Sequence, residues 1–438
     1  MTSATTMVIE GMVDDLSHDG RGVIKVADKI YFVPGALPGE TIRFIPRKKR
    51  KGILTGELQQ IVEPSTDRVN PPCEYFGVCG GCSLQHLRID AQLQHKEKVL
   101  FDNLQRIGSV KPEQRLQPLQ KESWHYRRKA RPGCKFVAKK GGILVGFREQ
   151  GNSFLTSLKS CKTLDTKLSD LLSPLHDLVQ QLSCYQQIPQ IEMALADNAV
   201  ALVMRHLVPL NDDDLATIAG FAQANNVHFY VQPGGLDTVA PVWPKKPDAL
   251  YYFLPDYDLQ MVFSATDFIQ VNGLVNQSMI NQALTHLQPV SNDHVLDLFC
   301  GLGNFTLPVA RSGAMVTGIE GDQVLVEKGR FNARHNRIDN VDFKAMNLHS
   351  EDVRLLADTQ YNKLLLDPPR SGALDVVTHL VPRLMPEKLV YVSCNPATLA
   401  RDADILVNQH GYRFTHAGAI DMFPHTAHIE SMGVFSLG

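Results

Sequence analysis

Regular alternation of strand-like and helix-like segments after residue 259 is the feature that most constrains the fold. Strand-like segments occur at 295–298, 315–320, 341–345, 363–367 and 389–393, the last of them beginning with the apolar run 389–392. Helical segments occur at 279–287 and 323–336, and a closing strand pair occurs at 414–420 and 431–435. Strands that alternate with helices form a parallel sheet with helices on both faces. We therefore predict a doubly wound α/β domain over residues 259–438.

The loop after the first of these strands carries the first candidate binding residues. Ligands of such sheets lie beyond the carboxyl ends of the strands. Gly301 and Gly303 let a ligand approach the backbone, but Thr306 replaces the last glycine of the dinucleotide pattern G-x-G-x-x-G. Glu320 ends the second strand, where it could accept hydrogen bonds from two ribose hydroxyls. The alternative for Glu320 is a solvated carboxylate at a helix start.

The same loop also resembles a known cofactor site. The run Val295-Leu296-Asp297-Leu298-Phe299-Cys300-Gly301-Leu302-Gly303-Asn304 is similar to the strand and glycine-rich turn with which Rossmann-like class I methyltransferases hold S-adenosylmethionine. Asn347 follows the third strand, where it could contact an adenine edge. The resemblance implies S-adenosyl-L-methionine as a cofactor.

Two motifs follow the fourth and fifth strands. Asp367 opens Asp-Pro-Pro-Arg-Ser-Gly at 367–372, and related D/N-P-P motifs occur in methyltransferases that act on nucleobases. The two prolines fix the turn. Cytosine-C5 RNA methyltransferases usually place a cysteine after the first proline, and here there is none. Cys394, directly after the strand 389–393, is therefore the candidate nucleophile, with an inert buried thiol as the alternative.

Covalent catalysis explains why a thiol would be needed there. C5 of a uracil is a weak nucleophile, so a thiolate must first add to C6. This scheme requires a thiol of lowered pKa and a base close to C5. Glu430, in His428-Ile429-Glu430 beside the last strand pair, is the candidate base. The alternative for Glu430 is a surface carboxylate.

A cysteine cluster lies far upstream, at Cys73, Cys79 and Cys82. Structural zinc sites commonly use two short cysteine pairs, and this segment has only one C-x2-C. An iron–sulfur cluster accepts a single distant fourth cysteine. On spacing alone, Cys134 and Cys161 both remain candidates for that ligand.

The residues before 259 predict two further domains. Residues 7–62 alternate apolar and polar positions between glycine-rich turns, which predicts a small antiparallel β-barrel over 1–65. Residues 15–22 (DLSHDGRG) resemble the signature of the TRAM module, an RNA-binding barrel. Residues 66–258 predict a central α+β domain of unresolved topology, with a helix at 84–104 and strands at 190–195 and 200–204.

Composition limits the class of protein. Apolar residues make up 44% and charged residues 21% of the 438, and no apolar run approaches the roughly 20 residues that span a bilayer. The first residues lack a signal-peptide pattern, so we expect a cytoplasmic protein without a membrane partner. The net charge is −2, yet residues 121–150 hold nine Lys/Arg against two Glu, and 47–51 are all basic. Both runs predict RNA contact or, alternatively, a solvated surface.

Taken together, the motifs resemble the RNA (uracil-5-)-methyltransferase family, in particular its 23S rRNA type, RlmD/RumA. The resemblance covers nearly the whole chain. It implies Cys394 as the nucleophile and Glu430 as the base, with iron–sulfur ligation by Cys73, Cys79, Cys82 and Cys161. It also implies cofactor contacts from Gln270, Phe299, Asn304, Glu320, Asn347 and Asp367.

Within that family, the combination of barrel and cysteine cluster favours the enzymes that methylate uracil 1939 of 23S rRNA. A different rRNA or tRNA uridine is the alternative target. A non-catalytic RNA-binding or iron–sulfur sensor protein is the alternative from another class, although both Cys394 and Glu430 are present. Radical methylating enzymes are disfavoured because the tight C-x3-C-x2-C pattern is absent.

Overall fold

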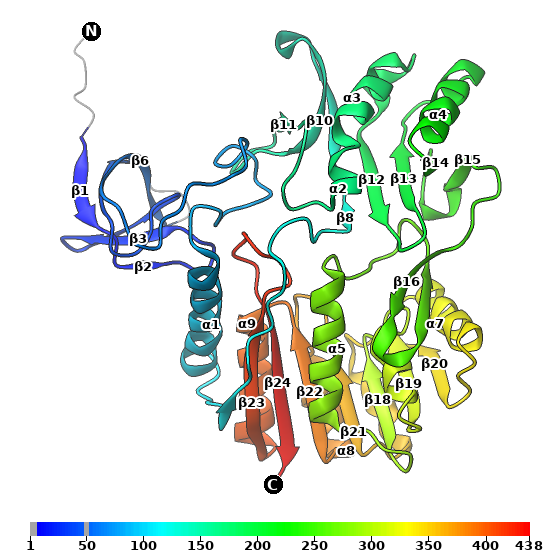
Figure 1. Ribbon diagram of the computed structural model, residues 1–438. Coiled ribbons are helices and arrows are strands. Elements are labelled where there is room, and N and C mark those ends of the chain that lie inside the picture. The colour runs from blue at the N-terminus through cyan, green and yellow to red at the C-terminus, as the bar shows by residue number, and fades with distance from the viewer. Residues whose placement is uncertain (1–6, 48–51) are drawn as a thin grey trace.

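The computed structural model describes residues 7–47 and 52–438, which build three sheet-based parts (Figure 1). A curled N-terminal sheet lies to one side, a central sheet lies above, and the sheet that carries the C-terminus lies below. Residues 48–51 of the predicted basic run lie outside the described residues. In the part of the chain that is described, no helix is both long and apolar enough to cross a membrane.

The N-terminal sheet has the strand order β1-β5-β6-β4-β3-β2. Its strands are β1 (Ile9–Met12), β2 (Asp15–Leu16), β3 (Gly22–Val26), β4 (Lys29–Val33), β5 (Thr41–Pro46) and β6 (Leu54–Glu63). Neighbours pair antiparallel except β4 and β6, so the predicted antiparallel order is wrong at this pair. The long β6 pairs with β4 through Leu54 and Thr55 and with β5 through its remaining length. A TRAM-like barrel over this sheet stays a prediction.

The central sheet is mixed, in the order β11-β10-β9-β12-β13-β14-β15, and β8 also pairs with β12. Its strands are β8 (Lys129–Ala130), β9 (Gly133–Val137), β10 (Gly142–Arg148), β11 (Leu155–Ser157), β12 (Gln190–Leu195), β13 (Val200–Arg205), β14 (Val227–Gln232) and β15 (Ala240–Trp243). The helices of this part are α2 (Thr166–Ser169), α3 (Leu172–Gln181) and α4 (Asp212–Ala224). The strands predicted at 190–195 and 200–204 are confirmed as β12 and β13.

The C-terminal sheet has the order β20-β19-β18-β21-β22-β24-β23-β7. It contains β18 (His294–Leu298), β19 (Met315–Glu320), β20 (Val341–Ala345), β21 (Lys363–Leu366), β22 (Lys388–Ser393), β23 (Tyr412–Ile420) and β24 (Glu430–Leu437). The helices around it are α5 (Gly273–Leu287), α6 (Thr306–Ala310), α7 (Gln323–His335), α8 (Val381–Leu384) and α9 (Pro396–Asp404). A hairpin of β16 (Leu250–Leu254) and β17 (Leu259–Phe263) precedes it.

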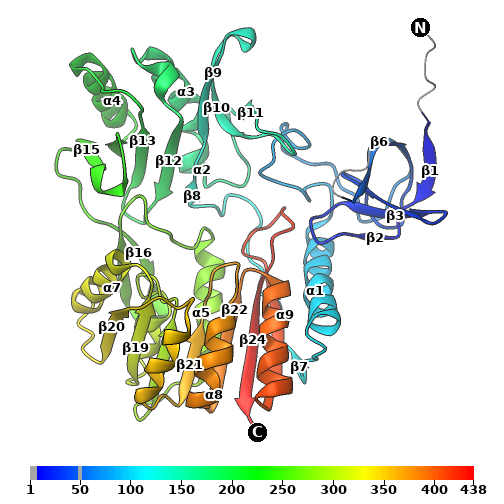
Figure 2. The ribbon, with the colours of Figure 1, turned by 180° about the vertical axis from the view of Figure 1, so that it is seen from behind.

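The strands β18 to β22 are parallel, while β24 and β23 close the sheet as an antiparallel pair. One face is covered by α5 (Figure 1), and α8 and α9 cover the other (Figure 2). Separate apolar cores fill the two faces. The predicted doubly wound domain is therefore confirmed.

Two elements from the segment before the central sheet join the C-terminal part. Helix α1 (Ile89–Arg106) packs against α9, and β7 (Gln114–Arg115) pairs in parallel with β23 at the sheet edge. The helix predicted at 84–104 begins later than expected, because α1 starts at Ile89. Leu84 donates its N–H to the carbonyl oxygen of His425, a contact that no local pattern reveals.

A buried ion pair attaches α1 to the C-terminal sheet. Lys96 Nζ lies 2.6 Å from Asp421 Oδ1, and both side chains are fully buried. Lys96→Met would leave a buried carboxylate without its cation, so we expect it to lower the free energy of unfolding by about 3–5 kcal/mol. Urea unfolding followed by tryptophan fluorescence measures this loss. Arg43→Ala is the control, because the half-exposed Arg43–Glu10 pair should contribute only about 0.2–1 kcal/mol.

Candidate active site

The first part of the site lies at the carboxyl ends of β18 and β21, where open α/β sheets bind ligands in a crevice. The chain runs from β18 outward to β19 and β20 and then returns to β21 on the other side of β18. Ligands bind at this kind of switch point in open α/β sheets. Phe299 follows β18 with a left-handed φ of 63°, and Asp367 follows β21, so the order of strands brings two predicted cofactor residues to one crevice.

The glycine turn is held against the second strand by Glu320. Its Oε2 accepts the N–H of Gly301 at 3.0 Å and its Oε1 accepts the N–H of Gly321 at 2.7 Å. Gly303 has φ 98°, and a Cβ there would lie 3.2 Å from Phe343 and from Leu307. A side chain at 303 would therefore be both strained and crowded.

The remaining predicted cofactor residues have different surroundings. Asn304 exchanges side-chain amide hydrogen bonds with Asn276, at 2.9 and 3.0 Å, and also accepts from the Tyr252 hydroxyl at 2.9 Å. Asn347 is exposed and its Oδ1 accepts the N–H of His349. Gln270 is half-buried in the segment between β17 and α5.

Carboxyl groups gather in the crevice. Burial raises the pKa of Asp297 to about 8, and the nearby Asp367 and Glu320 add to this increase. Burial raises the pKa of Asp367 to about 7. Thr306 donates to Asp297 Oδ2 at 2.5 Å, while Asp297 Oδ1 is buried without a partner. A ligand that brings positive charge or a hydrogen-bond donor would stabilise this arrangement.

Cys394 occupies the turn between β22 and α9. Ser393 Oγ donates to the carbonyl oxygen of Asn395 at 3.1 Å, so a hydrogen bond joins the two residues on either side of Cys394. Asn395 caps α9 by accepting the N–H of Ala397, and its Nδ2 donates to the carbonyl oxygen of Arg370 at 3.0 Å. The half-buried thiol is thus fixed between the end of a buried strand and the start of a helix.

Strand register brings Glu430 to the same edge. Ser431 of β24 pairs with Ser393 of β22, so Glu430 and Cys394 stand one residue beyond this pair on adjacent strands. Glu430 is 6% exposed, and burial together with Asp367 raises its pKa well above the usual value, while Arg370 opposes the increase. The predicted nucleophile and the predicted base are therefore neighbours.

The pKa of the thiol differs from the sequence-based expectation. Burial raises the pKa of Cys394 to about 11, and the charges of Glu430 and Asp367 add to the increase. Arg370 acts in the opposite direction but does not overcome these effects. The expected lowered pKa is therefore wrong for the RNA-free protein, because the sulfur is partly buried and two carboxyl groups lie near it.

A cavity of about 420 Å³ opens in front of the thiol. Four of its polar lining residues come from separate parts of the chain and were not predicted: His18, Asn103, Arg370 and His428. Arg370 belongs to the 367–372 motif and His18 to the TRAM-like signature, so both lay within recognised patterns. Asn103 on α1 carried no signal in the sequence. The N-terminal sheet thus contributes directly to the cavity.

Comparison with known proteins decides the family. A family model described as tRNA (Uracil-5-)-methyltransferase matches residues 253–437. A relative from Legionella pneumophila (strain Lens), named 23S rRNA (uracil(1939)-C(5))-methyltransferase RlmD, is 46% identical over 441 residues, covering 100% of this chain and 98% of the relative. The chain belongs to the RNA uracil-C5 methyltransferase family. A relative of the same name from Alkalilimnicola ehrlichii is 47% identical over 97% of this chain and 95% of its own.

The fold of this uracil-C5 methyltransferase also matches a solved structure. The tRNA (uracil-54, C5)-methyltransferase of Pyrococcus abyssi, in complex with S-adenosyl-L-homocysteine, aligns with a TM-score of 0.75 over 98% of this chain and 100% of that chain. The two sequences are 22% identical. This similarity confirms the methyltransferase fold.

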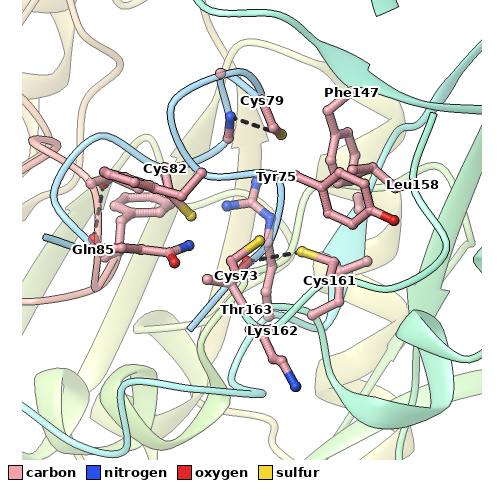
Figure 3. A pocket seen from close by; sticks show the side chains of 18 of the residues that line it. Cys73, Tyr75, Cys79, Cys82, Gln85, Phe147, Leu158, Cys161, Lys162 and Thr163 are labelled. Atoms are coloured by element: carbon pink, nitrogen blue, oxygen red, sulfur yellow. Dashed lines mark hydrogen bonds between the residues drawn. The ribbon is translucent and has the colours of Figure 1, made fainter. Parts of the chain in front are cut away.

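A second cavity, of about 470 Å³, contains the cysteine cluster (Figure 3). Cys73, Cys79, Cys82 and Cys161 all line it, whereas Cys134 on β9 is buried in the core of the central part. The sulfur atoms of Cys73, Cys82 and Cys161 point into the space between them. Within residues 7–47 and 52–438, no three His, Cys, Asp or Glu side chains form a group that could hold a single metal ion.

The basic segment 121–150 of the methyltransferase is partly neutralised. Glu192 pairs with Lys129 at 3.0 Å and with Arg131 at 2.9 Å. Arg128 lies 2.8 Å from Asp197. The local excess of positive charge is therefore smaller than the sequence indicates, because acidic residues of later strands and loops fold against it.

The raised pKa of Cys394 predicts a pH dependence. We expect alkylation of Cys394 by iodoacetamide, in RNA-free protein, to accelerate about tenfold per pH unit from pH 7 to pH 10. The thiolate is the reactive form, and with a pKa of about 11 its fraction keeps rising over this range. Mass spectrometry of the Cys394 peptide measures the rate. An alkylation rate that stops rising below pH 8 would contradict a raised pKa of Cys394.

Proposed function

We propose that this methyltransferase converts uracil 1939 of 23S rRNA to 5-methyluridine, with S-adenosylmethionine as the methyl donor. The observation that carries the chemistry is the placement of Cys394 and Glu430 on adjacent strand ends beside the β18–β21 crevice. The target is supported by relatives of this printed activity at 46% and 47% identity over nearly the whole chain.

Cys394 and Glu430, at the two adjacent strand ends, carry out different steps of the reaction. Cys394 first loses its proton to solvent, its thiolate then adds to C6 of the uracil, and electron density moves toward C5 and the adjacent carbonyl. S-adenosylmethionine, when bound, supplies a methyl group on a positively charged sulfur, and C5 takes this group. Glu430 then removes the C5 proton, the C5–C6 double bond re-forms and Cys394 leaves. The raised pKa of Glu430 makes its carboxylate a stronger base for that step.

The crevice fits a cationic cofactor. Burial raises the pKa values of both Asp297 and Asp367, and a sulfonium beside them would favour their charged forms. Glu320 already accepts three backbone N–H groups, from Gly301, Gly321 and Asp322, so a ribose hydroxyl would bind through the remaining acceptor capacity of its carboxylate. We assign the cofactor contacts to six residues: Gln270, Phe299, Asn304, Glu320, Asn347 and Asp367.

The cysteine cavity is the proposed site of a [4Fe–4S] cluster bound by Cys73, Cys79, Cys82 and Cys161. Each cysteine of such a cluster binds a different iron, so the four thiols need to surround a cavity rather than meet at one point. Four thiols around one cavity of about 470 Å³ fit this requirement. Burial and the neighbouring thiols raise the pKa of Cys82 to about 12, and bound iron would favour the thiolates.

Two cysteine variants distinguish the proposed ligand from its rival. Cys161→Ala is expected to abolish the binding of about four iron atoms per chain and the associated visible absorbance in anaerobically purified protein. Cys134→Ala is the matched control and should retain both, because Cys134 is a buried residue of β9 that does not line the cysteine cavity. Loss of iron in the Cys134 variant alone would reverse the assignment.

The RNA target is tested by mapping. Unmodified 23S rRNA and tRNA are each incubated with the protein and S-adenosylmethionine, and 5-methyluridine is located by mass spectrometry of nuclease fragments. Modification of uracil 1939 is the expected result. Modification of a different rRNA uridine, or of tRNA instead, would keep the chemistry and overturn the target.

A further inference from the structure

The loop between β23 and β24, residues 421–429, separates the two cavities of this protein. Ala427, His428 and Ile429 line the cavity in front of Cys394. On the other side, Phe423, Thr426 and again His428 line the cysteine cavity. We call residues 421–429 the dividing loop. Its position therefore shapes both cavities at once.

The conformation of the dividing loop is imposed by distant residues. His425 is 4% exposed and has a left-handed φ of 65°, which is unfavourable for a residue with a Cβ. Its N–H donates to Gln92 Oε1 at 2.8 Å, and the Trp124 ring stacks on its imidazole with the ring centres 3.6 Å apart. A backbone in this region persists only where its surroundings over-determine it.

The most direct of these contacts come from residues 73–87, which carry three of the cysteines and which we call the cysteine segment. Ser83, the residue after Cys82, accepts the N–H of Ala427 on its Oγ at 3.1 Å. The N–H groups of Ser83 and Leu84 both donate to the carbonyl oxygen of His425 at 3.0 Å. Three hydrogen bonds therefore join the cysteine segment to the middle of the dividing loop.

Helix α1 fixes the same contacts from behind. Gln92 is fully buried, and its Nε2 donates to the carbonyl oxygens of Leu84 at 3.0 Å and Leu87 at 2.7 Å. Gln92 thus holds the cysteine segment with one end of its amide and His425 with the other. At the start of the loop, Lys96 donates to the Phe423 carbonyl oxygen at 2.9 Å as well as pairing with Asp421.

We propose that Ser83 and Gln92 are positioning residues that set the wall of the Cys394 cavity from the cysteine segment. The inference rests on the proposed function, in which that cavity receives the target uracil. When the cysteine segment keeps its position, Ala427 and His428 lie in front of the Cys394 thiol. When it moves, the dividing loop loses the partners that keep His425 in its left-handed conformation, and the cavity widens.

A pair of substitutions at one position tests the proposal. Ser83→Ala removes the acceptor for the Ala427 N–H, whereas Ser83→Thr keeps a hydroxyl in the same place. We expect Ser83→Ala to lower kcat/KM on rRNA by about tenfold or more, because small misplacements at a reacting centre have large effects on rate. Alkylation of Cys394 in RNA-free protein should be severalfold faster, since the wall no longer shields the sulfur. Ser83→Thr should restore both values.

Two controls separate positioning from general damage. Affinity for S-adenosyl-L-homocysteine and the thermal midpoint should stay near wild-type values in Ser83→Ala, because the crevice between β18 and β21 is not altered. Ser312→Ala also removes a hydroxyl that accepts a backbone N–H, in this case from Ala314, but it lies outside both cavities and should leave rRNA activity and Cys394 alkylation unchanged.

The outcomes are distinguishable. Wild-type activity and alkylation in Ser83→Ala would overturn the positioning role, as would a parallel loss of cofactor affinity and thermal midpoint that Ser83→Thr does not rescue. Absence of uracil-C5 methylation by the wild-type protein would instead remove the proposed function. In that case, unchanged Cys394 alkylation in Ser83→Ala would overturn the inference separately, and faster alkylation would still support the control of the cavity wall.

Discussion

Cys394→Ala is expected to abolish product formation, with kcat reduced by at least about 10³-fold, and to leave no covalent complex with RNA. The reason is that C5 of the uracil becomes nucleophilic only after sulfur has added to C6. Methyl transfer from labelled S-adenosylmethionine and denaturing gels of the protein–RNA mixture measure the two effects.

Cys184→Ala is the matched control for this result. Cys184 is also a partly buried free thiol, but it lies in the central part of the molecule and lines neither cavity. Its substitution should leave turnover unchanged. Turnover by Cys394→Ala at more than about a tenth of the wild-type rate would rule out the covalent route.

Glu430→Gln is expected to give the opposite behaviour on gels, namely accumulation of a covalent RNA complex with kcat reduced by about 10²–10⁴-fold. The amide keeps the size of the side chain but cannot accept the C5 proton, so the reaction stops after methyl transfer with the sulfur still on C6. A slowly migrating, denaturation-resistant band that contains methyl label would identify this complex.

The control for this variant is an exposed carboxylate on α7, a helix that packs against β19 and β20. Glu327→Gln removes the surface ion pair with Arg330 and affects an exposed hydrogen bond from Gln323, so it should form product at the wild-type rate without a trapped band. If Glu430→Gln turns over normally, or shows no complex while Cys394 remains reactive, the base must be another group.

Much of the C-terminal domain was predictable because its central strands are buried on both faces. Buried parallel strands appear in the sequence as continuous apolar runs, and the strands predicted at 363–367 and 389–393 match β21 and β22, whose residues are almost all buried. The start of α1 was not predictable, because Leu84 is held by His425 on a distant loop. The topology of the central sheet likewise depends on pairings between segments far apart in the sequence.

The candidate site was also predictable from the sequence only in part. Motifs identified Cys394, Glu320 and Asp367, since each lies at the end of a strand or directly after it in a recognisable pattern. The contact between Cys394 and Glu430 depends on the register of β22 with β24, which only the structure gives. The pKa of the thiol could not be inferred from the motif, because its direction results from the burial and the carboxyl groups that surround it.

Release of tritium from rRNA that carries 5-³H-uridine tests the central claim most directly. Methylation through a C6 adduct replaces the C5 hydrogen, so wild-type protein with S-adenosylmethionine should release tritium into water, and Cys394→Ala should release none. Equal release by both proteins would show that the thiol is not the nucleophile. The absence of release from wild-type protein, on rRNA that it demonstrably binds, would contradict methyl transfer to uracil C5.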